Sequence, residues 1–170
     1  MAVLSDSDIV SLLREDTLRI EGFREENLTP NGYDVTVDEV WVPGNGSRFR
    51  EGTAEIPGRE WFVIGTKEFL ELPPNIVGEI WIRTTWMRKG ILSSFGRIDA
   101  GFKGNLTFSA FNASSSPTSM PIGERFAQVV FEEMRSTATK AYDRRSGNYQ
   151  GQRGITLSAA DHQRNSRSKA

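Results

Sequence analysis

An acid held between glycines is the first feature of this sequence that could do chemistry. The segment 96–104 (GRIDAGFKG) places Asp99 two residues before Gly101 and directly ahead of an apolar run. A turn at this point can hold a carboxylate beside a pocket, where it could accept a proton from water. Asp also caps tight turns by bonding its own downstream backbone, and the residues alone favour that role. Asp99 is our leading catalytic candidate, with turn capping as the alternative.

A cluster of cations and hydroxyls in the segment RTTWMR could bind phosphate. Arg83 and Arg88 supply guanidinium groups, and Thr84 and Thr85 supply hydroxyl donors, which suit phosphate oxygens. A strand that continued through this segment would place Arg83 and Thr85 on one face, whereas a turn or helix after Arg83 would arrange them differently. A solvated rim, with arginines paired to nearby acids, is an equal alternative.

Two further polar residues lie in or beside apolar runs. Gln128 is an uncharged polar residue within the run 126–131, so its amide needs a partner, in the commoner case a backbone group. Asp34 follows Asn31 and Gly32 at the opening of a long apolar run. Its carboxylate could hold a hydrated metal ion or cap a turn, and the turn has a slight lead.

The segment 142–154 (YDRRSGNYQGQRG) interleaves aromatic residues, cations and glycines. This mixture could close over a nucleotide by ring stacking and phosphate contacts, or it could be plain disorder. Apolar residues thin out from Ala141 onward, so we predict a domain over residues 1–140 and a flexible arm over residues 141–170. The single histidine, His162, lies in this solvated tail, where it would have no fixed position as a base.

Short apolar runs separated by turn residues must position these side chains. Residues 6–14 follow Ser5, a good N-cap residue, and carry apolar residues at helical spacing, which predicts a short N-terminal helix. Runs rich in Val, Ile, Trp, Phe and Thr predict strands at residues 33–42, 61–66, 76–83, 106–112 and 126–132. Many short strands with turns between them are typical of an all-β barrel or jelly roll.

Composition limits the class of protein. A chain of 170 residues with 37% apolar residues fits one domain with one core. The sequence has no cysteine, which excludes disulfides, a thiolate nucleophile and a zinc site built on sulfur. A net charge of −1, from 21 basic and 22 acidic residues, argues against direct nucleic-acid binding. No apolar run is long enough to cross a bilayer and the first residues are polar and acidic, so we expect a cytoplasmic protein without a membrane partner.

Taken in order from about residue 27 to residue 158, these segments resemble the motifs of the dUTPase and dCTP deaminase superfamily. The segment 96–104 resembles the third motif, whose aspartate activates the hydrolytic water and contacts the deoxyribose. That role would fall on Asp99. The segment 83–88 resembles the second motif, which holds the triphosphate, with threonines in place of the usual serines.

The segments 31–34 and 123–128 resemble the first and fourth motifs of the same superfamily. The resemblance implies that Asp34 reaches Mg²⁺ through water and that Gln128 helps to hold the phosphates. It further implies substrate contacts for Arg83, Thr84, Thr85, Arg88, Ser94, Arg97, Asp99, Thr107, Tyr142, Tyr149 and Gln152. The superfamily also implies a homotrimer whose active sites are shared between subunits.

Two positions depart from the deaminase branch. That branch has a glutamate five residues beyond the glycine equivalent to Gly104, where it shuttles protons for attack at C4, and Ser109 stands there in this sequence. A serine hydroxyl with no base beside it cannot supply reversible proton transfer. Asn148 replaces a phosphate-binding lysine, a loss that neighbouring arginines of the arm could offset. The pattern resembles the deaminase-like dUTPases of archaea.

We therefore predict an all-β, distorted jelly-roll subunit with a short N-terminal helix, forming homotrimers that hydrolyse dUTP to dUMP and pyrophosphate. Water activated by Asp99 would attack the α-phosphorus while Mg²⁺ and arginines neutralise phosphate charge. Backbone groups of residues 93–97 would distinguish uracil from cytosine, with Arg97 lining the site or forming a surface ion pair. The alternatives are a dCTP deaminase, a bifunctional dCTP deaminase and dUTPase, and a catalytically silent nucleotide-binding regulator.

Overall fold

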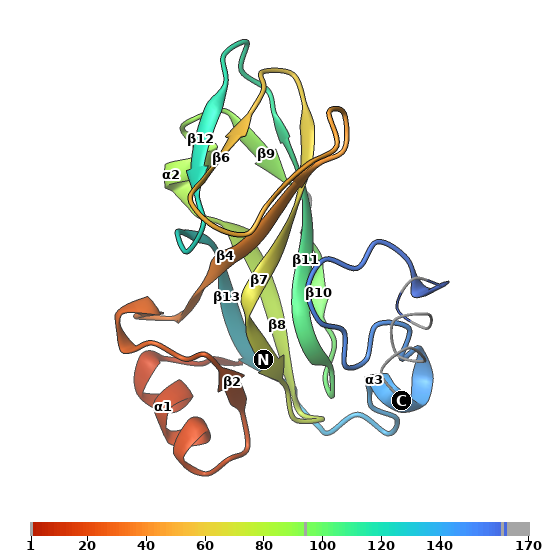
Figure 1. Cartoon of the computed structure of the whole chain (residues 1–170). Coiled ribbons are helices and arrows are strands. Elements are labelled where there is room, and N and C mark those ends of the chain that lie inside the picture. The colour runs from red at the N-terminus through yellow and green to blue at the C-terminus, as the bar shows by residue number, and fades with distance from the viewer. Residues whose placement is uncertain (1, 94, 161, 163–170) are drawn as a thin grey trace.

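The chain forms a strongly curled, mostly antiparallel β structure, seen in a computed structural model that describes residues 2–93, 95–160 and 162 (Figure 1). The strands are β1 (Ala2–Val3), β2 (Arg19–Glu21), β3 (Leu28–Thr29), β4 (Gly32–Val42), β5 (Ser47–Phe49), β6 (Thr53–Ile56), β7 (Trp61–Glu71), β8 (Ile76–Ile82), β9 (Ile91–Ser93), β10 (Arg97–Ile98), β11 (Lys103–Asn112), β12 (Thr118–Pro121) and β13 (Arg125–Glu133). The helices are α1 (Asp6–Arg14), the 3₁₀ helix η1 (Glu25–Asn27), α2 (Thr84–Met87) and α3 (Tyr142–Arg145). The predicted all-β class and the short N-terminal helix are confirmed.

The larger sheet has the strand order β10-β8-β13-β4-β7-β11-β9, and four short strands pair with its members. The strands β12 and β6 pair separately and lie at the far end of the molecule from α1 (Figure 1). Each of the five predicted long strands is present. The structure extends β7 to Glu71 and begins β11 at Lys103, beyond the predicted bounds.

Alternation along β11 decides which side chains face the core. Leu106, Phe108 and Ala110 are buried, and Phe108 packs against Phe126 at 6.0 Å between ring centroids. Because successive side chains of a strand point to opposite faces, Thr107 and Ser109 lie on the outer face. This alternation is what makes two polar side chains available to a site outside the core.

The N-terminal helix α1 begins as predicted at Ser5. The Ser5 hydroxyl accepts the Asp8 N–H at 3.3 Å, and the Asp8 carboxylate accepts the Ser5 N–H at 2.9 Å. This reciprocal pair satisfies two amide donors that the first helical turn leaves free. No helix in the described part of the chain is long and apolar enough to cross a membrane.

A buried carboxylate holds the point where β4 changes partners. β4 pairs with β13 as far as Thr36 and with β7 from Val37 onward. Glu68 on β7 is fully buried, and its carboxylate accepts the Thr36 N–H at 2.8 Å and the Thr36 hydroxyl at 2.7 Å. Burial raises the pKa of Glu68, while the two Thr36 hydrogen bonds act in the opposite direction.

Neutralising Glu68 tests this arrangement. The unfolded chain ionises Glu68 near its ordinary pKa of 4.5, whereas the folded protein retains the proton to higher pH. Wild-type stability should therefore fall as pH rises from that value through the raised pKa. Glu68→Gln removes this loss and can keep both contacts, because its Oε1 can accept the Thr36 N–H while its Nε2 donates to the Thr36 hydroxyl. We expect a higher unfolding temperature for the variant at about pH 7.5 and no difference near pH 4.

Calorimetry at several pH values measures this effect, since about 1 kcal/mol shifts Tm by roughly 2–4 °C in a chain of this size. Glu55→Gln is the matched control, because Glu55 is exposed and the Ser119 hydroxyl is the only hydrogen-bond partner of its carboxylate in the described structure. An unchanged or lower Tm for Glu68→Gln at about pH 7.5 would contradict the assignment.

Candidate active site

A cavity of about 570 Å³ lies between β11, the segment that precedes Asp99, and the arm. Six of the predicted site residues line it together, namely Arg97, Asp99, Thr107, Tyr142, Tyr149 and Gln152. Ser109 also lines this cavity, and Phe95, Phe102 and Leu106 contribute apolar wall. Asp99 is the sole carboxylate among the described residues that line it.

Backbone geometry presents Asp99 to the cavity. The Asp99 carbonyl accepts the Phe102 N–H at 3.0 Å, and Gly101 has φ 85°, as the third residue of a type II turn requires. A Cβ at Gly101 would also come within 2.6 Å of the Ala141 Cβ. Within the described structure no hydrogen bond reaches the Asp99 carboxylate, so the backbone closes the turn and the exposed side chain is free for a ligand.

Two tyrosines of the arm form one wall of the cavity. The Tyr149 N–H donates to the Tyr142 hydroxyl at 3.1 Å, and the Tyr142 ring meets Phe102 edge-on at 5.5 Å between centroids. Burial raises the pKa of the Tyr142 phenol, and the negative charge of Asp99 adds to the effect. Tyr142 therefore stays protonated near neutral pH and can donate a hydrogen bond to a ligand.

Gln152 is fixed with one atom unsatisfied. Its Nε2 donates to the Asn105 carbonyl at 2.6 Å, and because a carbonyl only accepts, this contact sets the orientation of the amide. Gln152 is only 6% exposed, and its buried Oε1 has no hydrogen-bond partner in the described structure. A buried acceptor of this kind needs a donor, which an N–H or O–H group of a ligand in the cavity could supply.

The remaining predicted residues form a second cluster around Asp34. Arg83 lies 2.9 Å from the Asp34 carboxylate and Arg125 lies 3.5 Å from it, while Asp34 is 3% exposed. Burial raises the pKa of Asp34, and the two guanidinium groups oppose that shift. Arg83 is the N-cap residue of α2, so a helix follows the strand. The Thr84 and Thr85 side chains of this helix are exposed, as is Arg88 at its C-cap.

Gln128 belongs to the second cluster. It is opposite Asp34 in the β13–β4 register, and its Nε2 donates to the Thr29 hydroxyl at 2.6 Å. The prediction of a backbone partner for Gln128 is therefore wrong, because β3 brings a side-chain hydroxyl within reach.

One subunit does not bring the two clusters together. β10 places Ile98 opposite Gly78 on β8, and Arg83 follows Gly78 by five residues. At the usual rise of a strand, Arg83 is roughly 17 Å from the level of Ile98, which precedes Asp99. None of the residues predicted to hold phosphate lines the cavity of Asp99 in the described chain.

A resident metal site does not emerge from the described residues. They contain no group of three or more His, Asp or Glu side chains placed to hold an ion. The carboxylate of Asp34 instead faces two guanidinium groups, Arg83 and Arg125. A magnesium ion bound mainly by substrate phosphates would fit this arrangement better than one held by the chain itself.

Three further residues named in the sequence analysis are Arg97, Ser94 and His162. Arg97 lines the cavity and also forms the expected ion pair, with Glu79 of β8. Ser94 lies outside the described residues. The picture of His162 as a solvated residue is wrong, because its Nε2 lies 2.8 Å from the Gln150 carbonyl and it is half-buried.

The sequence reasoning missed cavity residues on β7 and at the end of the arm. Trp61, Val63, Thr156 and Leu157 line the cavity as well. Trp61 is opposite Phe111 in the ladder, on the outer face that also carries Ser109. The alternation of side chains along β7 could have indicated Trp61 and Val63. No local sequence pattern indicates where the arm lies on the sheet.

Comparison with known proteins identifies the family of the chain. The dCTP deaminase-like family model matches residues 45–134. Proteins named dCTP deaminase from Pyrococcus horikoshii and Thermococcus gammatolerans are each 41% identical, covering 86% and 85% of this chain and 92% and 91% of their own lengths. A protein of Sulfolobus islandicus rod-shaped virus 1, named a probable deoxyuridine 5'-triphosphate nucleotidohydrolase, is 31% identical over 94% of this chain and 99% of its own.

Solved structures show the same fold. The dCTP deaminase of Agrobacterium tumefaciens superposes with a TM-score of 0.66 at 16% identity over 77% of this chain, which spans 48% of that longer chain. The native EIAV dUTPase superposes with a TM-score of 0.52 at 22% identity, covering 76% of this chain and 98% of its own. The chain belongs to the dCTP deaminase-like family, within the dUTPase and dCTP deaminase superfamily.

Proposed function

We propose that this protein is a dUTP diphosphatase, which hydrolyses dUTP to dUMP and pyrophosphate. One observation carries the proposal. Among the described residues that line the cavity, Asp99 is the only carboxylate. The resemblance to the superfamily motifs implies that Ser109 stands where the deaminase branch has its glutamate. The cavity thus offers one strong base for activating water and no second carboxylate to move protons on a pyrimidine ring.

In the proposed reaction, Asp99 accepts a proton from water as the water oxygen attacks the α-phosphorus. The bond from that phosphorus to the bridging oxygen breaks, and pyrophosphate leaves. Tyr142 and Tyr149 contact the base or sugar, and Gln152 accepts a hydrogen bond from a nucleotide donor through its Oε1. Magnesium bound to the triphosphate of the substrate would lower the charge that the chain must neutralise.

The phosphate-binding residues come from a neighbouring subunit in this proposal. Arg83 is too far along β8 to reach the cavity of its own chain, and the α2 hydroxyls and Arg88 are exposed. Trp81 and Met87 beside this cluster are 62% and 51% exposed, which is unusual for large apolar side chains. A homotrimer would cover these side chains and join the Arg83 cluster of one subunit to the Asp99 cavity of another.

A dCTP deaminase is the second candidate, and the names of the archaeal relatives at 41% identity favour it. Deamination at C4 requires a group that gives a proton to the ring and receives one from water. Ser109 would need a base beside it. In the described structure the Ser93 hydroxyl donates to the Ser109 backbone carbonyl at 2.8 Å, and no hydrogen bond joins the Ser109 hydroxyl to a base. Asp99 would then have to carry out the proton transfers of deamination.

Replacing Asp99 tests the catalytic assignment. Asp99→Asn keeps the shape of the side chain and removes the base, so turnover of dUTP should fall by roughly 10²–10⁴-fold with nucleotide affinity largely intact. Pyrophosphate release measures turnover, and calorimetric binding of the dUTP analogue dUpNHpp measures nucleotide affinity. Asp143→Asn, an exposed arm carboxylate outside this cavity, is the matched control. A wild-type protein that binds dUTP without turnover would instead be a silent regulator.

Ser109 separates the two reactions. Ser109→Ala should change dUTP turnover by no more than about twofold, because the proposed hydrolysis assigns no proton transfer to its hydroxyl. Wild-type protein should leave dCTP unchanged when the base is identified by chromatography. Uracil products from dCTP that disappear in Ser109→Ala would reverse both conclusions and make Ser109 part of a deaminase.

Mixing inactive subunits tests the shared site. Arg83→Lys keeps a charge beside Asp34 but loses the planar fork, and Asp99→Asn loses the base, so each alone should be strongly impaired. When the two variants are unfolded and reassembled in equal amounts, about one quarter of shared sites would regain both wild-type residues. Activity that stays at the level of the separate variants would contradict sharing, provided the mixture has the mass of a trimer.

A further inference from the structure

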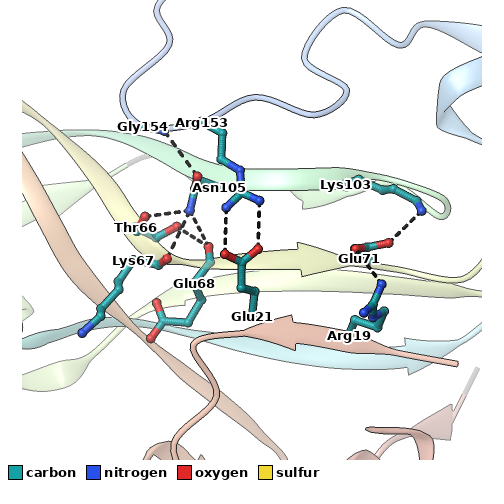
Figure 2. A network of polar contacts seen from close by, with 10 residues as sticks. All are labelled: Arg19, Glu21, Thr66, Lys67, Glu68, Glu71, Lys103, Asn105, Arg153 and Gly154. Carbon is teal, nitrogen blue, oxygen red and sulfur yellow. Dashed lines mark hydrogen bonds and ion pairs between the residues drawn. The ribbon is translucent and has the colours of Figure 1, made fainter. Parts of the chain in front are cut away.

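The arm is seated on its own subunit through Asn105 of β11 (Figure 2). The Asn105 side-chain amide donates to the carbonyls of Thr66 and Glu68 at 3.0 and 2.9 Å, and its Oδ1 accepts the Gly154 N–H at 3.3 Å. The Asn105 backbone donates to the Gln152 carbonyl at 3.0 Å and accepts from the Gln152 side chain. Asn105 therefore fixes Gln152 at the cavity and ties it to a bulge of β7.

Arg153, the next residue of the arm, points away from the cavity toward the N-terminal part of the chain. Its guanidinium makes two hydrogen bonds to the Glu21 carboxylate, at 3.2 and 2.8 Å. The same guanidinium lies 3.8 Å from the centroid of the Phe69 ring. Figure 2 shows Arg153 descending from the arm to meet Glu21, beside the contacts of Asn105.

The sheet places both partners of Arg153 side by side. β2 pairs with β7 so that Glu21 is opposite Phe69. A fork that is both bidentate and stacked on a ring is stronger and more specific than an ordinary surface ion pair. Because Glu21 and Arg153 are separated by 132 residues, this contact joins the N-terminal segment to the arm.

We propose that Glu21 and Phe69 form a latch that holds Arg153, and so keeps the arm closed with Gln152 at the cavity, before any nucleotide binds. Arg153 is a positioning residue in this proposal, since it acts through Gln152. The latch must release for a nucleotide to enter or leave. The proposal rests on the proposed function only in treating this cavity as the nucleotide site.

The latch should govern rates more than affinity. The contact of Arg153 with Glu21 does not include the cavity, so it stabilises the closed arm equally with and without ligand. An interaction that is equal in both states shifts no binding equilibrium. Loss of the latch should therefore speed both entry and release of nucleotide.

Hydrogen exchange in the absence of nucleotide tests the latch directly. The amides of Gly151, Gly154, Ile155 and Thr156 donate to Lys103, Asn105, Glu39 and Thr107 only while the arm is seated. Glu21→Gln removes the charge of an exposed residue and should speed exchange of these amides by about threefold to tenfold. Added salt should speed exchange in the wild type and have little effect in the variant.

Glu26→Gln is the matched control. Glu26 is an exposed carboxylate of η1 that accepts a hydrogen bond from Arg24 at 2.7 Å, on the opposite side of the molecule from the arm (Figure 1). Exchange that is equal in wild type, Glu21→Gln and Glu26→Gln would overturn the latch, as would equal acceleration by both variants. Because hydrogen exchange needs no turnover, its result does not depend on the proposed reaction.

Stopped-flow binding of dUpNHpp completes the test. Glu21→Gln should raise the association and dissociation rate constants together, each by about threefold to tenfold, with Kd nearly unchanged. A higher Kd with an unchanged association rate would show that Glu21 supports the bound state alone and would overturn the gating role.

Discussion

The reverse turn from Asp99 to Phe102 is the constraint on which the cavity depends. Gly101 adopts a positive φ that other residues rarely take, and the turn leaves the Asp99 side chain without a partner in the described structure. The same turn receives the root of the arm, because the Tyr142 N–H donates to the Ala100 carbonyl at 3.0 Å. The proposed base and the arm that covers it thus share one backbone anchor.

Buried polar side chains extend this anchoring into the sheet. Bulges leave backbone groups without ladder partners, and buried groups of that kind need other hydrogen bonds. Asn105 supplies them for β7, and Glu68 supplies them for Thr36 of β4. A buried amide and a buried carboxylate are costly, yet each replaces ladder bonds that the curvature of the sheet removes.

Local sequence patterns predicted the features of this molecule that depend on residues close together in the chain. Alternating apolar residues located the five long strands, and Ser5 located the start of α1, because both signals act within a few residues. The segment around Asp99 was predicted for the same reason. The pairing of Asp34 with Arg83, and of Glu21 with Arg153, depends on strand register between distant segments. No window of sequence contains that information, and none contains the separation of the two clusters along the direction of β8.

Similarity of sequence and chemistry of the site point in different directions here, and the site is the more specific guide to reaction. Identity of 41% with proteins named dCTP deaminase concerns a whole chain, most of which builds the sheet. The choice between hydrolysis at phosphorus and attack at C4 depends on a single group that can exchange protons with the ring. Tyr142 is not a base near neutral pH, since burial raises the pKa of its phenol. Asp99 is then the only base on the described cavity wall, and one base suffices for hydrolysis, in which pyrophosphate leaves as a stable anion.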